Sequence, residues 1–144
     1  MADWEVLQDC VTYAIHLIRR QVHRKRLTQP EKKHNITDYP AIVVACGYER
    51  SHEVFWAQCA SPINYVYSDR IKERLEALGT IGDKRVQCKN TIGACAEPHA
   101  ADKVIKHFPG CQMNELQFSE AYRPRTAQRK RYCQNCKDTF PEVL

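Results

Sequence analysis

The sequence predicts an α/β sandwich, in which helices pack on a central β-sheet. Three observations support this fold class: helical spacing of apolar residues at about 2–27, two short apolar runs at 41–46 and 54–60, and a second helical pattern at about 97–108. A chain of 144 residues fits one compact domain, because single cores of roughly 100 to 150 residues are the commonest size. We therefore expect a single domain over residues 1–144.

The first element is expected to be an amphipathic helix at about residues 2–27. Apolar residues recur there at intervals of three and four, as one buried helix face requires. They are Trp4, Leu7, Val11, Ala14, Ile15, Ile18 and Val22. The far end, residues 19–26, is strongly basic, which suits the C-terminal end of the helix dipole and would also allow contact with phosphates. Two prolines and many polar residues then predict a loop over 28–40.

A β-hairpin is predicted next. Residues 41–46 form a short continuous apolar run, which is typical of a buried strand. The polar residues 47–53 are typical of a turn, and residues 54–60 supply a second strand. We expect the two strands to pair antiparallel, and we place the core of the domain at about 41–140.

The second half of the chain adds helices and a further strand to this hairpin. Ser68 or Asp69 can cap one helix, and residues 97–108 have the spacing of another. A third strand is expected between residues 116 and 121. The basic segment 123–131 and a last turn or helix complete the domain.

Charge and cysteine content limit the class of protein. The 22 Lys and Arg residues exceed the 17 Asp and Glu residues, so the net charge is +5 and the calculated pI is about 8.8. This balance favours a polyanionic partner, although a solvated basic surface explains it equally well. The eight cysteines have no framework-like spacing, which favours a reducing compartment; a cysteine-rich secreted interaction domain is the alternative. No signal peptide or membrane span is recognised, so we expect a cytoplasmic location and no membrane partner.

Two short motifs carry the chemistry. Cys95-Ala96-Glu97, followed by Pro98, is placed to open a helix, because proline is well tolerated in a first helical turn. Cys133-Gln134-Asn135-Cys136 has the two-residue spacing that lets both sulfurs reach one tetrahedral ion. Together the motifs offer three thiolate ligands, a fourth position for water and a nearby carboxylate that is not itself a ligand.

These motifs resemble the cytidine-deaminase superfamily, whose pattern is His or Cys, one residue, Glu and, later in the chain, Cys-x-x-Cys. Residues 93–98, 121–126 and 132–136 look more narrowly like the toxin-type branch, which includes domains at the ends of bacterial polymorphic toxins. Two positions depart from the usual pattern. Cys95 stands where the best-known polynucleotide deaminases have His, and Tyr132 stands where Pro usually precedes the first paired Cys.

The resemblance implies a three-layer α-β-α sandwich with a central mixed sheet. Zn²⁺ would be held by Cys95, Cys133 and Cys136, and Glu97 would be the catalytic proton carrier. The implied reaction is hydrolytic deamination of cytosine to uracil in single-stranded DNA or RNA, because the base must be exposed to the nucleophile. Adenine and a free nucleoside are alternative substrates. The toxin-type branch also implies an exported effector with an immunity protein as a partner, and it leaves the oligomeric state unknown.

Residues near the two motifs are candidates for substrate contacts. Asn90 and Thr91 precede the expected metal-bearing helix and could hydrogen-bond a sugar or base, or simply form a turn or cap. Aromatic residues that could stack on a base, or serve packing alone, are Trp56, Tyr65, Tyr67 and Tyr122. Basic residues that could contact phosphates, or serve solubility alone, are Arg123, Arg125, Arg129, Lys130 and Arg131.

Other arrangements of the cysteines are compatible with the sequence. A closed structural cage of four thiolates would leave Glu97 without a role, and a non-catalytic nucleic-acid-binding module is the corresponding function. Its ligands would be Cys88, Cys95, Cys133 and Cys136. His99 and His107 are alternative ligands, although both are more typical of a helix surface. The remaining cysteines lie in apolar surroundings and are expected in the core; they are Cys10, Cys46, Cys59 and Cys111.

Overall fold

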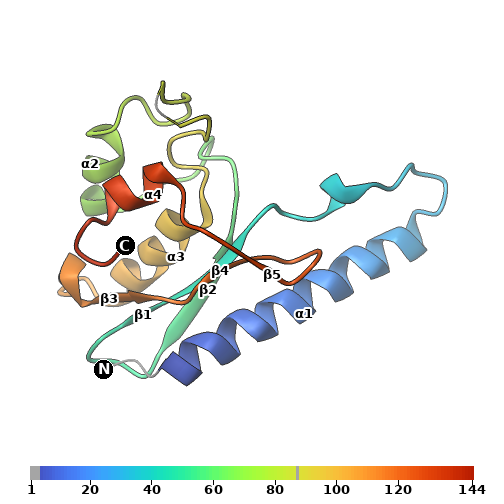
Figure 1. Ribbon diagram of the computed structural model, residues 1–144, viewed down its shortest axis with the longest axis horizontal. Coiled ribbons are helices and arrows are strands. Elements are labelled where there is room, and N and C mark those ends of the chain that lie inside the picture. The colour runs from blue at the N-terminus through green and yellow to red at the C-terminus, as the bar shows by residue number, and fades with distance from the viewer. Residues whose placement is uncertain (1–3, 87) are drawn as a thin grey trace.

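The computed structural model describes residues 4–86 and 88–144, which form a mixed α/β fold with a five-stranded antiparallel sheet (Figure 1). The helices are α1 (Trp4–Thr28), α2 (Asp69–Glu76), α3 (Ala96–His107) and α4 (Gln134–Thr139), with two short 3-10 helices, η1 (Ile36–Asp38) and η2 (Met113–Glu115). The strands are β1 (Val43–Tyr48), β2 (Val54–Gln58), β3 (Leu116–Phe118), β4 (Ala121–Arg123) and β5 (Gln128–Lys130). The predicted α/β class is confirmed.

Strand β1 lies at the centre of the sheet. It pairs with β2 on one side and with β3 and β4 on the other, and β5 pairs with β4. Every pair among the described residues is antiparallel, so the predicted mixed sheet is wrong there. The short connections at 49–53 and 124–127 account for two of these pairs, β1–β2 and β4–β5, because parallel neighbours need a longer crossover.

The predicted third strand is split in two at Ser119 and Glu120. Ser119 is buried, its N–H donates to the Ala45 carbonyl at 2.8 Å, and its Oγ accepts from the Ala45 N–H at 2.9 Å. Its Oγ also donates to the carbonyl of Glu120. These side-chain bonds replace the regular ladder locally, so the chain is interrupted between β3 and β4 while the buried backbone groups of β1 keep partners.

Helices cover both faces of the sheet, which gives the expected three layers. Val43 and Ala45 of β1 pack against α1, whereas Val44 and Cys46 pack in the cluster that contains α2, α3 and α4 (Figure 1). Burial on both faces explains why this strand is a continuous apolar run rather than an alternating one.

Helix α1 has the buried face that the sequence predicts, except at its start. Leu7, Val11 and the later apolar residues of the pattern are buried, but Trp4 is 52% exposed. Residues 2 and 3 of the expected helix lie outside the described residues. The C-terminal part of α1 extends past the sheet (Figure 1). No helix in the described part of the chain combines the length and apolar character needed to cross a membrane.

Candidate metal centre and its cavity

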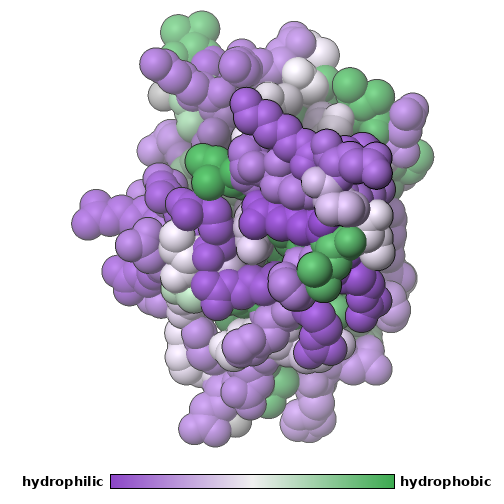
Figure 2. All heavy atoms as spheres, turned by 90° about the vertical axis from the view of Figure 1, so that its right-hand side faces the viewer, coloured by the Kyte–Doolittle hydropathy of each residue, from purple (hydrophilic) through white to green (hydrophobic). Residues whose placement is uncertain are grey.

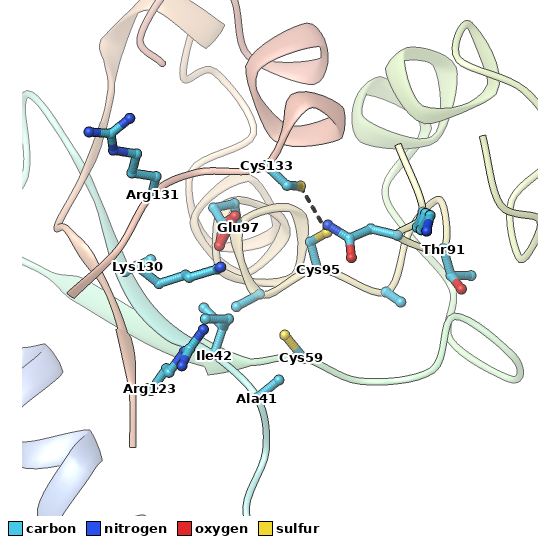
Figure 3. A pocket seen from close by; sticks show the side chains of 15 residues that line it. Ala41, Ile42, Cys59, Thr91, Cys95, Glu97, Arg123, Lys130, Arg131 and Cys133 are labelled. Carbon is cyan, nitrogen blue, oxygen red and sulfur yellow. Dashed lines mark hydrogen bonds between the residues drawn. The ribbon is translucent and has the colours of Figure 1, made fainter. Parts of the chain in front are cut away.

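Three cysteine sulfurs meet at the N-terminal ends of α3 and α4. Cys95 is the N-cap residue of α3, Cys133 is the N-cap residue of α4, and Cys136 lies within α4. The Cys133 sulfur lies 3.5 Å from each of the other two, and all three lie within 4.8 Å of one another. Figure 3 shows Cys95 and Cys133 of this group. A tetrahedral ion with zinc–sulfur bonds of about 2.3 Å holds its sulfurs roughly 3.8 Å apart. The group could therefore hold a metal ion.

Hydrogen bonds within this group distribute the protons unequally. Bonds from the thiols of Cys136 and Cys95 lower the pKa of Cys133, and the side-chain amide of Asn90 adds to this effect. The bonds to Cys133 raise the pKa values of Cys95 and Cys136. A bound metal ion would displace the thiol protons of the group, because metal-ligating cysteines are deprotonated.

Glu97 lies in the first turn of α3, two residues after the first sulfur ligand. Its side chain is buried, with 3% of the residue exposed, and its Oε1 has no hydrogen-bond partner in the described part of the chain. Burial raises the pKa of this carboxyl to about 7, and the nearby Cys133 thiolate adds to the rise. A buried oxygen without a donor is costly, so this atom is suited to a ligand or water that arrives with the metal.

A cavity of about 410 Å³ opens beside Cys95, Glu97 and Cys133. In Figure 3, Glu97, Arg123 and Lys130 point into the same space from α3, β4 and β5. The cavity is thus bordered by a buried carboxyl, three cysteine side chains and several cations. None of the described residues that line it is aromatic.

The structure brings five of the eight predicted substrate and phosphate residues to this cavity. They are Asn90, Thr91, Arg123, Lys130 and Arg131. Asn90 has a structural role as well, because its carbonyl accepts a hydrogen bond from the Asn135 amide of α4 at 3.0 Å. Arg85 in turn donates to Asn135 at 3.1 Å and to Asp138 at 2.7 Å. These contacts hold the loop before α3 against α4.

The other three predicted contacts do not line the cavity. Tyr122 alternates with Ala121 and Arg123 along β4, so it faces α1, where its hydroxyl accepts from the Gln8 amide at 2.6 Å. Arg129 lies opposite Tyr122 and pairs with Glu120 at 2.8 Å. Arg125 lies in the turn between β4 and β5, outside the cavity.

Two of the cavity residues that carry a thiol or a charge were not predicted from the sequence. Cys59 was expected in the core, yet it is half-buried and lines the cavity directly after β2. Burial raises the pKa of its thiol to about 11, so it stays protonated at neutral pH. Lys89 adds a further cation next to Asn90. Their position at the end of β2 and just before the loop that leads into α3 was the available signal.

The alternative ligands are placed elsewhere. Cys88 is not among the described residues whose donor atoms gather within 4.8 Å, so the four-thiolate cage does not form. His99 is buried rather than on the helix surface, and its Nε2 binds the Ala60 carbonyl at 3.0 Å. His107 binds the carbonyl of Lys103.

The aromatic candidates for base stacking also have packing roles. Tyr65 and Tyr67 contact the ring of His99, with centroids 4.6 and 5.1 Å away. Trp56 lies beneath the ammonium group of Lys103. Of the four cysteines expected in the core, Cys46 and Cys111 are buried, and Cys10 is half-buried.

Comparison with protein-family models, with curated proteins and with solved structures finds no match for this chain. The chemistry of the site therefore rests on its own residues. Three convergent thiolates suit a soft or borderline ion such as zinc, and the unpartnered Oε1 of Glu97 belongs to the residue two positions after Cys95. The residues present fit a zinc ion.

Proposed function

We propose that this protein is a zinc-dependent hydrolytic deaminase that converts cytosine to uracil in single-stranded DNA or RNA. One observation carries the proposal. Two residues of the three-sulfur group, Cys95 and Cys133, border the same open cavity as the buried carboxyl of Glu97, whose Oε1 has no hydrogen-bond partner in the described chain. A structural zinc site has four protein ligands, whereas a catalytic site has three and an open position. The second arrangement is the one that Cys95, Cys133 and Cys136 support.

Cys95, Cys133 and Cys136 would hold the metal. When bound, Zn²⁺ supplies a nucleophile at neutral pH by lowering the pKa of a coordinated water molecule. Three thiolates donate more negative charge than two thiolates and an imidazole, which weakens this effect. The cations of the cavity wall, Arg123, Lys130 and Arg131, offset part of that charge.

Glu97 would move the protons of the reaction. Its carboxylate accepts a proton from the attacking water and delivers it to the ring nitrogen next to the reacting carbon. The amino group then leaves as ammonia after it gains a proton, so one water is consumed and one ammonia is released. A carboxyl whose pKa lies near 7 can both accept and donate protons at neutral pH.

The cavity suits a nucleobase that has left its stack. Its volume of about 410 Å³ falls in the usual range for small-ligand sites. Asn90 and Thr91 lie on its wall and can hydrogen-bond a base or sugar, while the neighbouring cations can meet phosphates. A free nucleoside carries no phosphate, so these cations favour a nucleotide within a strand. They do not discriminate cytosine from adenine.

A substrate panel tests the proposal. Zinc-loaded protein is incubated with single-stranded DNA, single-stranded RNA, duplex DNA and free nucleosides, each with cytosine or adenine as the reactive base. We expect uracil in single strands, much less in duplexes, and loss of activity after chelation that returns with zinc. Conversion of free nucleosides alone, or of adenine alone, would correct the substrate. Tight zinc and nucleic-acid binding without conversion of any substrate would favour the non-catalytic binding module.

A further inference from the structure

The cations around the cavity are free of carboxylate partners. Several cations elsewhere in the described chain are paired, as are Arg74 with Glu142 at 2.7 Å and Arg85 with Asp138 at 2.7 Å. Arg123, Lys130 and Arg131 line the cavity and have no ion-pair partner among residues 4–86 and 88–144. Cations that are not neutralised within the protein are available to an anionic ligand.

The turn between β4 and β5 connects these cations to helix α1. Arg19 of α1 donates a hydrogen bond from Nη2 to the carbonyl of Arg125 at 2.9 Å. The guanidinium of Arg19 therefore lies at the turn that carries the exposed residue Arg125, two positions after the cavity residue Arg123. Exposed cations thus follow the chain from the cavity through the turn to its contact with α1.

Helix α1 extends this surface beyond the sheet. Arg20, Arg24 and Lys25 are exposed and have no ion-pair partner in the described chain, whereas Arg26 is paired with Asp38 at 3.0 Å. Figure 2 looks at the molecule from the side toward which α1 extends, and hydrophilic side chains cover most of that face. We call Arg125, Arg19, Arg20 and Arg24 the outer basic track. The three α1 arginines lie within one arc of the helix at 3.6 residues per turn, whereas Lys25 lies on another side.

We propose that the outer basic track binds the phosphates of a single-stranded nucleic acid outside the reacting nucleotide. This inference rests on the proposed function in one respect, namely that the reacting base occupies the cavity. None of the described residues that line the cavity is aromatic, so stacking adds little affinity there. Binding must then draw on phosphate contacts, and a strand supplies these at regular intervals along a line that leaves the cavity.

Binding measurements on the full chain test this inference. Fluorescence anisotropy compares the zinc-loaded wild type with the double variant Arg19→Gln, Arg125→Gln. The probes are a labelled trinucleotide and a labelled strand of about eighteen nucleotides, neither containing cytosine or adenine, so that no substrate turnover interferes. A matched control removes two exposed cations of α2 by Arg70→Gln and Lys72→Gln, which carries the same change in net charge.

The double variant is expected to lose affinity for the long strand and to bind the trinucleotide as the wild type does. Each lost phosphate contact lowers the dependence of log affinity on log salt by about 0.7 for a single strand. The slope should therefore fall by about 1.4 for the double variant, and the α2 control should keep the wild-type slope. Equal affinity of all three proteins for the long strand would overturn the proposed role of the track. An equally large loss of affinity for polyglutamate would also overturn it, because this result would indicate an acidic protein partner.

The outcome is separable from that of the proposed function. If the double variant binds the long strand as the wild type does and the wild type deaminates normally, the track is refuted and the proposed function stands. If the double variant binds the long strand more weakly and the wild type deaminates no substrate, the track is supported and the proposed function is refuted.

Discussion

The sulfur of Cys95 lies 3.5 Å from the sulfur of Cys133, although the two residues are 38 positions apart in the chain. The contact joins the N-terminal ends of α3 and α4, which η2 and the three strands β3, β4 and β5 separate in sequence. A metal ion at this point would bind two helices that pack on each other, so metal binding and folding should be coupled.

Replacing a ligand should abolish this coupling. We expect Cys133→Ser to lower zinc affinity at least about 100-fold, since loss of outer residues alone commonly costs 10- to 100-fold. The control Cys88→Ser should retain one zinc per chain, because Cys88 lies outside the three-sulfur group. Zinc content after dialysis against a competing chelator, measured by mass spectrometry of metals, checks both. An equal loss of zinc from the two variants would indicate that Cys88 is also a ligand, as in the four-thiolate cage.

Asn90 offers a test of the loop before α3. Its amide lies within reach of the Cys133 thiolate, and its carbonyl binds Asn135. We expect Asn90→Ala to weaken zinc binding about 10- to 100-fold. The control Thr91→Val replaces the cavity residue next to Asn90 with a side chain of the same shape. It should keep the zinc affinity and change only the Michaelis constant. Competition with a chromogenic chelator measures the affinity. If Asn90→Ala binds zinc with wild-type affinity, Asn90 does not support the metal site and is a candidate for substrate contact alone.

Alanine substitutions at three glycines distinguish the destabilisation caused by backbone strain from that caused by steric crowding. Gly93, two residues before Cys95, has a φ of +86° and would place a Cβ 3.1 Å from Ile81 and 3.2 Å from Pro62. Gly82 has a φ of +98° and open space, and Gly110 has open space without a positive φ. Alanine should cost about 1 kcal/mol or more at Gly82, more at Gly93 and almost nothing at Gly110. Urea unfolding midpoints give the order, and an equal cost at Gly82 and Gly93 would exclude crowding.

Asp102 should make stability depend on acid pH. It is fully buried and accepts from the Ser68 N–H at 2.8 Å, from Tyr65 and from Lys106 at 2.8 Å. Burial alone would raise the pKa of this carboxyl, but the bonds to Lys106, Tyr65 and Ser68 outweigh it and lower the pKa below 3.8. Its stabilisation is therefore present above the ordinary pKa and is lost as pH falls through the lowered value.

Asp102→Asn should therefore cost about 1–3 kcal/mol at neutral pH, because it removes a charged acceptor from buried donors. The difference from the wild type should shrink below about pH 4 as the wild-type carboxyl gains a proton. Free energies of unfolding between neutral and acid pH measure this convergence. A difference that stays constant with pH would show that Asp102 is not ionised in the folded protein.

The sequence predicts more of the site than of the sheet. The Cys95 and Glu97 spacing at the start of a helix and the paired cysteines at 133 and 136 depend on local geometry, and the structure places them as expected. Tyr122 could not be assigned in this way. Alternation along β4 sends every second residue to one face, but both faces are covered by helices, so hydropathy does not tell which face borders the cavity.

The buried state of His99 was equally inaccessible from sequence. Its exposure depends on Tyr65 and Tyr67, which lie more than thirty positions earlier and fold over α3 from the loop before α2. The split of the third strand depends on Ser119 meeting Ala45, a contact 74 positions apart. Long-range contacts of this kind are set by tertiary packing and leave little trace in local periodicity.

The most direct test of the account compares wild-type protein with Glu97→Gln under identical zinc loading. Both proteins should bind one zinc and unfold at similar temperatures, because Cys95, Cys133 and Cys136 are unchanged. Only the wild type should convert cytosine to uracil in a single strand, and the variant should be slower by a factor of about 100 to 10,000, the usual contribution of a general acid–base. Equal conversion by the two proteins, or conversion by neither with zinc fully bound, would contradict the assignment of Glu97 and of the three-sulfur centre to catalysis.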